Sequence, residues 1–269
     1  EGFDDWAQEL VETGYLHNHS RMWFASIWIF TLRLPWELGA DFFLRHLVDG
    51  DPASNTLSWR WVAGLHTKGK TYLARCSNIS KYTEGRFRPE YKLSSTAEPL
   101  VEALEHPKRP VPAASDLPDA DFILLVTEED GLIGDCLPRP PSSVIGCLAT
   151  EDRSTQPVGD KAAAFARGAL VDAIGRLGHP NALRDGDWGD AVLAETASTG
   201  VADVVTSYAP VGPVRSRLDT LSSRLESEGV RLHQIRREYD ELAWPHAAKG
   251  FFALKQKIPH VLRGLGLGG

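Results

Sequence analysis

An almost uninterrupted apolar stretch between Asn18 and Leu34 constrains this chain most strongly. Its side chains are mostly those of tryptophan, phenylalanine, isoleucine and alanine, with few polar residues between them. A helix that is apolar almost all round has to be buried on several sides. The stretch is too short and too interrupted to span a bilayer. We therefore expect it to form the buried centre of a helical domain.

A second helix is predicted further along the chain by an N-capping pattern. Asp51 precedes Pro52, the order of an N-cap followed by proline at the first helical position, so this helix should extend to about Gly64. Asn55 and Trp59 are four residues apart and therefore lie on one face of it. The pattern places a polar amide and an indole side by side in an apolar setting.

Arg21 and Asp49 fall at the ends of two different predicted helices and are able to pair across a pocket. An isolated charge among apolar helices is costly, so breaking such a buried pair should cost about 3–5 kcal/mol. From the residues alone, a core ion pair surrounded by aromatic side chains explains the pattern as well as a binding site does.

The order of these residues resembles the flavin-binding domain of the DNA photolyase and cryptochrome family. The resemblance rests on Thr13-Gly-Tyr-Leu-His-Asn-His-Ser-Arg-Met22, then Trp36, then Leu47-Val-Asp-Gly-Asp-Pro-Ala-Ser-Asn-Thr-Leu-Ser-Trp-Arg-Trp61. It covers about residues 5–92, and several matches in one order are more specific than a lone motif. The segments after residue 65 depart from the commoner family text, which suggests a divergent bacterial branch.

The resemblance implies that the domain binds FAD. The positions matching Asp49, Gly50 and Asp51 contact the flavin in the family, and the asparagine matching Asn55 faces the N5 edge of its ring. The arginine matching Arg21 pairs with the first of these aspartates. A bound flavin carries its own electronic chemistry, so such residues supply orientation, nearby charge and exclusion of water.

The resemblance also implies an electron path through tryptophans. Those matching Trp59 and Trp36 are the proximal and middle members of the chain that photoreduces the flavin in the family. We expect Trp6, Trp23 and Trp28, which also lie on apolar helices, to be core residues.

Four further positions are expected to contact DNA. Asn18, Met22 and Trp61 match residues that line the family's pocket for a flipped-out pyrimidine dimer, where an aromatic ring offers a stacking surface. His19 replaces an arginine that commonly contacts DNA. Histidines occupy the places of Asn18 and Met22 in the branch that repairs (6-4) photoproducts, so the resemblance favours cyclobutane dimers.

These residues lead to one main functional hypothesis and two alternatives. The main hypothesis is light-driven, FAD-dependent repair of cyclobutane pyrimidine dimers in damaged DNA, a carbon–carbon lyase activity. The first alternative is a cryptochrome-like blue-light photoreceptor without repair activity. The second is a module that keeps the fold but holds no flavin. Because Met22 is the only methionine and the family's upstream part has no counterpart here, we expect the sequence to be a fragment that lacks the amino-terminal part of the domain.

A basic tract follows Trp61, although the net charge of the chain is −7. Residues 60–92 contain eight cationic side chains against Glu84 and Glu90: Arg60, Lys68, Lys70, Arg75, Lys81, Arg86, Arg88 and Lys92. Such a tract suits contact with phosphates, and an ordinary solvated loop is the alternative.

The second half of the chain predicts a different architecture. Residues 93–120 form a Pro-rich linker that carries one short helix around Glu98–Glu105. Beyond it, strands are predicted over 121–127, 143–149, 202–208 and 230–235, with helices over 160–177, 188–200 and 213–229. Alternating strands and helices imply a mostly parallel, Rossmann-like α/β domain over 121–269 with helices on both faces.

The predicted chain is therefore multidomain, with a helical FAD- and DNA-binding segment over 1–92, the linker and the α/β domain. The latter loosely resembles the α/β domain at the amino end of photolyases, where a second, antenna chromophore binds in some members. Three scattered cysteines form no metal-binding spacing and no even disulfide set. With 42% hydrophobic and 24% charged residues and no signal peptide or transmembrane run, we expect a soluble cytoplasmic protein, monomeric and without a bound metal.

Overall fold

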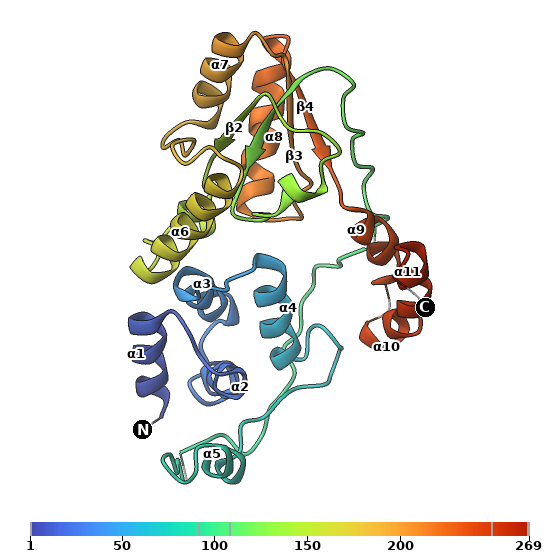
Figure 1. Cartoon of the computed structure of the whole chain (residues 1–269). Coiled ribbons are helices and arrows are strands. Elements are labelled where there is room, and N and C mark those ends of the chain that lie inside the picture. The colour runs from blue at the N-terminus through green and yellow to red at the C-terminus, as the bar shows by residue number, and fades with distance from the viewer. Residues whose placement is uncertain (1, 91, 108, 249, 268–269) are drawn as a thin grey trace. The chain divides into compact units, whose positions relative to one another are not determined.

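The computed structural model describes residues 2–90, 92–107, 109–248 and 250–267 (Figure 1). The chain contains many helices and one small, four-stranded parallel sheet, as expected for the α/β class. Contacts divide it into two compact units. We call Glu1–Leu104, Ala149–Gly168 and Val211–Pro213 the helical unit, and the remaining residues the sheet unit. The domain boundaries predicted at residues 92 and 121 remain a prediction.

Six helical segments form the first part of the helical unit. They are α1 (Phe3–Thr13), α2 (Asn18–Ser26), a π-helical turn (Ile27–Thr31), α3 (Trp36–His46), α4 (Pro52–Ala63) and α5 (Cys76–Tyr82). Aromatic side chains fill the core between them, among them Trp6, Trp23, Phe24, Phe43 and Trp59. Each of these five is at most 3% exposed, so the aromatic residues of the sequence form one buried cluster.

The predicted apolar helix is present but ends earlier than Leu34. From α2 the backbone passes into the π-helical turn, where the Leu32 N–H donates to the Ile27 carbonyl over 2.9 Å. Arg33 then adopts a left-handed conformation with φ 55°, which few non-glycine residues do. Pro35 follows and caps α3. The helical run therefore ends at Thr31, before the sequence ceases to be apolar.

The second predicted helix is confirmed at both ends. The Asp51 carboxylate accepts a hydrogen bond from the Ser54 N–H, and Pro52 occupies the first turn of α4. At the other end Gly64 has φ 80°, a left-handed conformation in which glycine carries no steric penalty. The local sequence therefore sets both boundaries of the helix that later supplies Asn55 and Trp59.

The sheet unit contains the four predicted strands, each slightly shorter than expected. They are β1 (Phe122–Val126), β2 (Ser143–Gly146), β3 (Asp203–Ser207) and β4 (Arg231–Ile235). All pairs are parallel, in the order β2-β1-β3-β4, and Leu124 of β1 pairs with Val144 of β2 and with Val205 of β3. The predicted helices correspond to α6 (Asp160–Arg176), α7 (Trp188–Thr199) and α8 (Pro213–Ser227).

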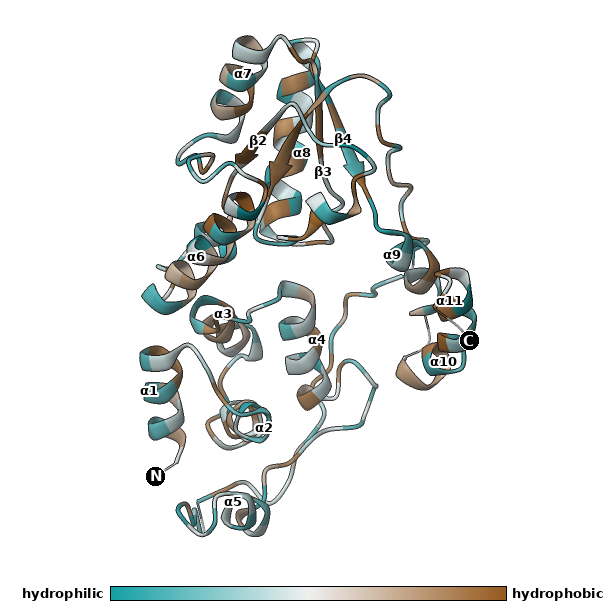
Figure 2. Cartoon of the chain, in the orientation of Figure 1, coloured by the Kyte–Doolittle hydropathy of each residue, from teal (hydrophilic) through white to brown (hydrophobic). Residues whose placement is uncertain are grey.

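Both faces of the central strand β1 are buried. Leu124 shares one core cluster with Leu170 and Ile174 of α6. Ile123 and Leu125 point to the opposite face and are also 0% exposed. Figure 2 shows β1 and β2 as strongly hydrophobic, whereas the edge strand β4 is more polar. This pattern is typical of a parallel sheet covered on both sides.

The remaining elements are short. They are 3-10 turns over Ile133–Cys136, Thr150–Arg153 and Trp244–His246, and the helices α9 (Glu238–Ala243), α10 (Phe251–Lys255) and α11 (Ile258–Gly264). Within the described ranges, every helix is too short or too polar to cross a membrane.

The predicted helix around Glu98–Glu105 is wrong, because residues 98–105 are not helical. We call residues 93–102 the strap, since they have no helix or strand and lie along the helices of the helical unit. The Ser94 N–H donates to Thr31 Oγ1 over 3.1 Å, and the Leu100 N–H donates to the Ala63 carbonyl over 3.0 Å. A short helix gains little by itself, so these distant partners decide the conformation of the strap.

Candidate functional site

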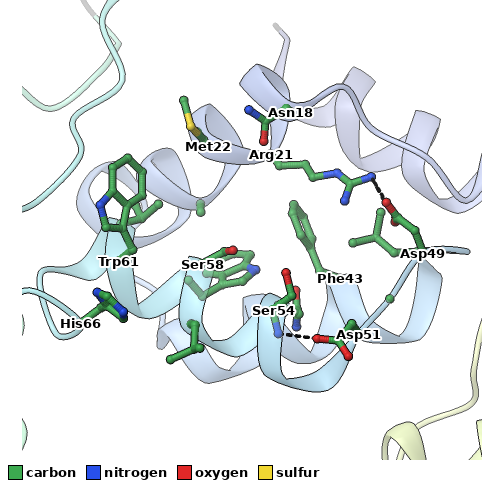
Figure 3. A pocket seen from close by; sticks show the side chains of 17 residues that line it. Asn18, Arg21, Met22, Phe43, Asp49, Asp51, Ser54, Ser58, Trp61 and His66 are labelled. Carbon is green, nitrogen blue, oxygen red and sulfur yellow. Dashed lines mark hydrogen bonds and ion pairs between the residues drawn. The ribbon is translucent and has the colours of Figure 1, made fainter. Parts of the chain in front are cut away.

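A pocket of about 510 Å³ opens between α2, the end of α3 and α4 (Figure 3). Its volume lies within the roughly 300–1,000 Å³ that is typical of small-molecule sites. The pocket brings together nine of the predicted site residues: Asn18, Arg21, Met22, Asp49, Gly50, Asp51, Asn55, Trp59 and Trp61. His19 and Trp36 do not line it. Residues from three separate stretches of sequence therefore converge on one cavity.

The predicted pair of Arg21 and Asp49 is present at one edge of this pocket. Arg21 Nη2 lies 3.1 and 3.0 Å from the two carboxylate oxygens of Asp49, and Arg21 Nε donates to the Leu16 carbonyl over 2.8 Å. However, the two side chains are 25% and 55% exposed. The expectation of a buried pair is therefore wrong, since water still reaches both charges and screens their attraction.

Asn55 connects the two helices behind the pocket. Its side chain is buried, and its Nδ2 donates to the Ala40 carbonyl of α3 over 2.8 Å. Since the amide nitrogen is used in this bond, the oxygen Oδ1 is left as an acceptor on a residue that lines the cavity. The hydrogen bond also fixes the rotation of the amide relative to α3.

Trp59 carries an unsatisfied polar atom at the pocket. The residue is 2% exposed, and its Nε1 is buried without a hydrogen-bond partner among the described residues. Its ring packs edge-on against Phe43, with centroids 5.1 Å apart, and against Trp28 at 6.2 Å. A buried donor without a partner costs about 1–3 kcal/mol. A bound group with acceptor atoms would recover that loss, which is a property of the flavin ring with its carbonyl and ring-nitrogen acceptors.

Gly50 allows close approach of the backbone beside Asp49 and Asp51. A Cβ atom at this position would lie 3.0 Å from the Leu47 carbonyl oxygen and 3.2 Å from that of Leu44. Any other residue would therefore have to displace the end of α3. The loop that carries the two aspartates is tight because of this glycine.

Several lining residues were missed by the sequence analysis. Ser54, Leu57 and Ser58 lie on the pocket face of α4, and Phe43 and His66 line other parts of it. The signal for Ser54 and Ser58 was available, since they precede Trp61 at the spacing of one helical face. Arg153 does not line the pocket but donates to the carbonyl of the lining residue Leu47 over 3.4 Å, a contact that the sequence did not signal because the two residues are more than 100 positions apart.

The residues expected to contact a flipped base lie at the open side of the pocket. Asn18 is exposed, Met22 is half-buried and Trp61 is 40% exposed. Trp61 stacks on Tyr72 with ring centroids 5.6 Å apart. Figure 3 shows Asn18 and Met22 on one helix and Trp61 on the other side of the cavity.

His19 takes part in a separate stack of rings. Its centroid lies 4.5 Å from that of Tyr82, 5.3 Å from that of His17 and 5.6 Å from that of Trp23. His17 also caps α2 by accepting a hydrogen bond from the His19 N–H. The histidines therefore stabilise the start of the helix that carries Asn18.

Trp36 borders a second cavity, of about 620 Å³, rather than the first. The Arg60 guanidinium lies over the Trp36 ring, 5.7 Å from its centroid. Arg60 also forms a two-fold ion pair with Glu102 of the strap, at 2.6 and 3.1 Å, and this hydrogen bonding raises the pKa of Arg60. Arg60 is thus engaged with the protein itself, whereas Lys68, Lys70 and Arg75 of the basic tract are exposed.

Comparison with known proteins identifies the first third of the chain. Residues 4–91 match the family described as the FAD binding domain of DNA photolyase. Among curated proteins, the deoxyribodipyrimidine photo-lyase of Streptomyces griseus is 48% identical over 60 residues, which are 22% of this chain and 13% of that protein. The enzyme of the same name from Synechococcus sp. is 45% identical over 77 residues, 28% of this chain and 16% of the relative.

A third photo-lyase, from Escherichia coli, is 37% identical over 65 residues, 24% of this chain and 14% of that protein. The chain thus spans less than a fifth of the length of these relatives. No solved structure matches it. The matched residues contain the pocket with its aspartate loop, its buried asparagine and its unsatisfied indole. Residues 4–91 are therefore a segment of the kind found in the FAD-binding domain of the DNA photolyase family.

Proposed function

We propose that this chain is part of a light-driven, FAD-dependent lyase that repairs cyclobutane pyrimidine dimers in DNA. The observation that carries the proposal is the pocket itself. It is lined by the loop with Asp49 and Asp51, by Asn55, by Trp59 with its unsatisfied Nε1, and by the residues around Trp61 at its open side. The relatives to which the chain is similar are named deoxyribodipyrimidine photo-lyases, a name that gives a dipyrimidine as their substrate. When bound, the reduced flavin supplies the light-driven electron that opens the dimer and takes it back afterwards.

The residues of the pocket would divide this work among them. Asp49, Gly50 and Asp51 hold the polar edge of the flavin ring, and Arg21 keeps the Asp49 carboxylate in place. Asn55 offers its Oδ1 to the ring, held by its bond to Ala40. These side chains are fixed by hydrogen bonds before a ligand arrives, which lowers the entropic penalty of binding.

The open side of the pocket would receive the lesion. Trp61 is backed by Tyr72, so one face of its indole is supported while the residue remains 40% exposed. A base flipped out of the duplex can stack on such a face, and a damaged pair is easier to extrude than an intact one. Asn18 supplies a hydrogen-bonding amide and Met22 an apolar wall, and neither is able to act as an acid or base.

Exposed cations after Trp61 would hold the DNA backbone. Lys68 and Lys70 have no ion-pair partner among the described residues and are exposed. Phosphate contacts of this kind add affinity that falls with salt and do not depend on the lesion. In this proposal, residues 1–92 act as the FAD- and DNA-binding domain, and residues 121–269 form a separate α/β domain after the linker.

An absorption spectrum and a pair of titrations test the proposal. The full-length protein should show a flavin band, and should bind a dimer-containing oligonucleotide more tightly than its undamaged twin at one salt concentration. Trp61→Ala should narrow that preference by about tenfold, as expected for a stacking contribution of roughly 1–3 kcal/mol. Lys68→Ala is the matched control and should weaken binding to both oligonucleotides together. Equal affinity of the unmutated protein for the two would refute repair and favour the photoreceptor.

A further inference from the structure

Trp28 lies in direct contact with Trp59, although its place on an apolar helix predicts only a core residue. The two indole centroids are 6.2 Å apart and the rings are nearly perpendicular, at 88°. Among the described residues, the other ring neighbours of Trp59 are Phe24 and Phe43. Trp36 is not among them. Trp28 is therefore the one oxidisable indole that touches Trp59.

A hydrogen bond connects Trp28 to the backbone just before α3, the helix that begins with Trp36. The Trp28 Nε1–H donates to the Pro35 carbonyl oxygen over 2.8 Å. That carbonyl belongs to the peptide bond whose nitrogen is that of Trp36, the first residue of α3. Trp28 is thus linked to Trp59 by a ring contact and to Trp36 through the carbonyl of the adjoining Pro35.

Two backbone features make this contact possible. Trp28 lies in the π-helical turn, an irregularity that is frequent at functional sites. Opposite it, α3 presents Gly39, where a Cβ atom would lie 2.2 Å from Trp59 Cη2 and 3.1 Å from Trp28 Cε2. A side chain at residue 39 would therefore occupy the space in which the two indoles meet.

The other tryptophans of the core lack these connections. Trp6 and Trp23 contact each other, with centroids 5.6 Å apart, and neither contacts Trp59. The Trp23 Nε1–H donates to Asn78 Oδ1 over 2.9 Å, away from α3. Trp23 is also 1% exposed, whereas Trp28 is half-buried. Proximity within an aromatic core thus does not by itself explain the arrangement of Trp28.

We propose that Trp28 is an electron relay between Trp59 and Trp36, an inference that rests on the proposed flavin in the pocket. Once Trp59 had given one electron to a bound, photoexcited flavin, Trp28 would give one electron to the Trp59 radical cation and would become the radical cation itself. Trp36 then reduces Trp28 in the same way. A soluble thiol returns one electron to Trp36, loses its proton to water and becomes a thiyl radical. No bond between heavy atoms forms or breaks.

The surroundings of Trp28 and Trp36 suit the proposed electron transfer. The Pro35 carbonyl accepts the Nε1–H of Trp28, so its partial negative charge stabilises the cation formed there. Trp36 borders the second cavity together with Glu37 and Glu102, which gives a small reductant access to the outer ring. The ion pair of Glu102 with Arg60 offsets the positive charge that lies over Trp36.

The test uses the full-length, FAD-loaded protein with a thiol as reductant. Trp28→Phe should slow flavin photoreduction by about tenfold or more while FAD stays bound, and Trp23→Phe should leave the rate unchanged. Trp28→Tyr, which keeps an oxidisable ring, should give an intermediate rate of photoreduction. This variant also tests the relay if the phenylalanine variant folds poorly. Wild-type rates in the tyrosine and phenylalanine variants would overturn the relay.

A second measurement needs no flavin. Indoles in contact couple their electronic transitions, so the changes that Trp28→Phe and Trp59→Phe cause in the near-ultraviolet circular dichroism of the flavin-free protein should not add up in the double variant. The changes caused by Trp23→Phe and Trp59→Phe, whose rings are not neighbours, should add up. Additive changes for Trp28 and Trp59 would refute the contact. An unmutated protein that shows no flavin band overturns the proposed function and this inference together. A flavin band with photoreduction that does not depend on Trp28 overturns this inference alone.

Discussion

Two arginine–aspartate ion pairs, Arg21 with Asp49 in the helical unit and Arg231 with Asp203 in the sheet unit, differ in burial. Arg21 donates from Nη2 to both Asp49 oxygens over 3.1 and 3.0 Å, and Arg231 donates from Nε and Nη2 to the two Asp203 oxygens over 2.8 and 2.7 Å. The Asp49 side chain is 55% exposed, whereas that of Asp203 is 3% exposed. The same chemical pair is thus able to serve a solvent-accessible cavity in one place and the interior of a sheet in the other.

The difference follows from what surrounds each aspartate. Asp203 begins β3 and also hydrogen-bonds His233 of β4, at 2.7 Å, so it joins two neighbouring strands at their amino ends. Hydrogen bonding from Arg231, followed by that from His233, lowers the pKa of Asp203 to about 2. Asp49 instead occupies a pocket rim. The comparison separates a carboxylate that stabilises the fold from one that is available to a ligand.

The largest expected effect is on the buried side of this comparison. Asp203→Ala should lower the free energy of unfolding by about 2–3 kcal/mol, because it removes charge-assisted hydrogen bonds from a buried site. Urea denaturation measures this directly. Asp121→Ala is the matched control, since Asp121 precedes β1 and is 82% exposed. If both variants lost the same amount, burial would not distinguish the two kinds of aspartate.

Packing without charge should give the next largest effect. Gly39→Ala places a methyl group against Trp59, so we expect a loss of about 1–3 kcal/mol even though alanine is favoured over glycine in helices. Gly168→Ala in α6, where a Cβ atom meets nothing within 4 Å, should instead stabilise by up to about 1 kcal/mol. Denaturation curves in which both variants gain stability would show that α3 yields to the added methyl group.

The buried Asp203 should also make the stability of the protein depend on pH. Because the folded pKa of Asp203 lies below its unfolded value, its contribution is fully present above about pH 4 and is lost as the pH falls toward 2. The loss should amount to about 1–2 kcal/mol, since Arg231 is 68% exposed and its attraction is screened. Urea denaturation at several pH values should show this slope in the unmutated protein, and a weaker one in Asp203→Asn. If the stability of the unmutated protein and of Asp203→Asn changed with pH by the same slope, Asp203 would not be the cause of the pH dependence.

The smallest change in stability is expected at the pocket rim. Asp49→Ala should cost less than about 1 kcal/mol of unfolding free energy, because the pair with Arg21 is exposed. In contrast, FAD retention by the full-length protein should fall strongly. Asp41→Ala breaks another half-exposed pair, with Arg45 at 2.9 Å, away from the pocket and should leave FAD bound. A loss of several kcal/mol in Asp49→Ala would mean that the rim pair is structural after all.

How far the sequence predicts the structure depends on how local the cause is. The ends of α4 are predictable because Asp51, Pro52 and Gly64 act on their own turns. The strands β1, β2 and β3 are predictable for a similarly local reason, since each contains a short run of apolar residues. The residues of the pocket could be gathered in advance only through the family resemblance, because α2 and α4 meet in space and not in sequence.

The predictions that were wrong concern features that depend on residues far apart in the sequence. The strap is not helical because Ala63 and Arg60 supply partners about 40 residues away. The burial of Arg21 and Asp49 depends on how the helices close around them. The contact of Trp28 with Trp59 depends on a π-helical turn and on a glycine of a third helix. The periodicity of apolar residues in the sequence cannot predict an arrangement that depends on three separate segments.

The strap also determines where the chain can be truncated. The family match ends at residue 91, which invites a fragment that stops there. Leu93 and Ala97 pack against the aromatic core, and the backbone of Leu100 satisfies a carbonyl at the end of α4. A fragment ending at residue 92 would expose that core and leave Arg60 without Glu102. A boundary beyond Leu104 keeps the helical segments together with the stretch of chain that seals them.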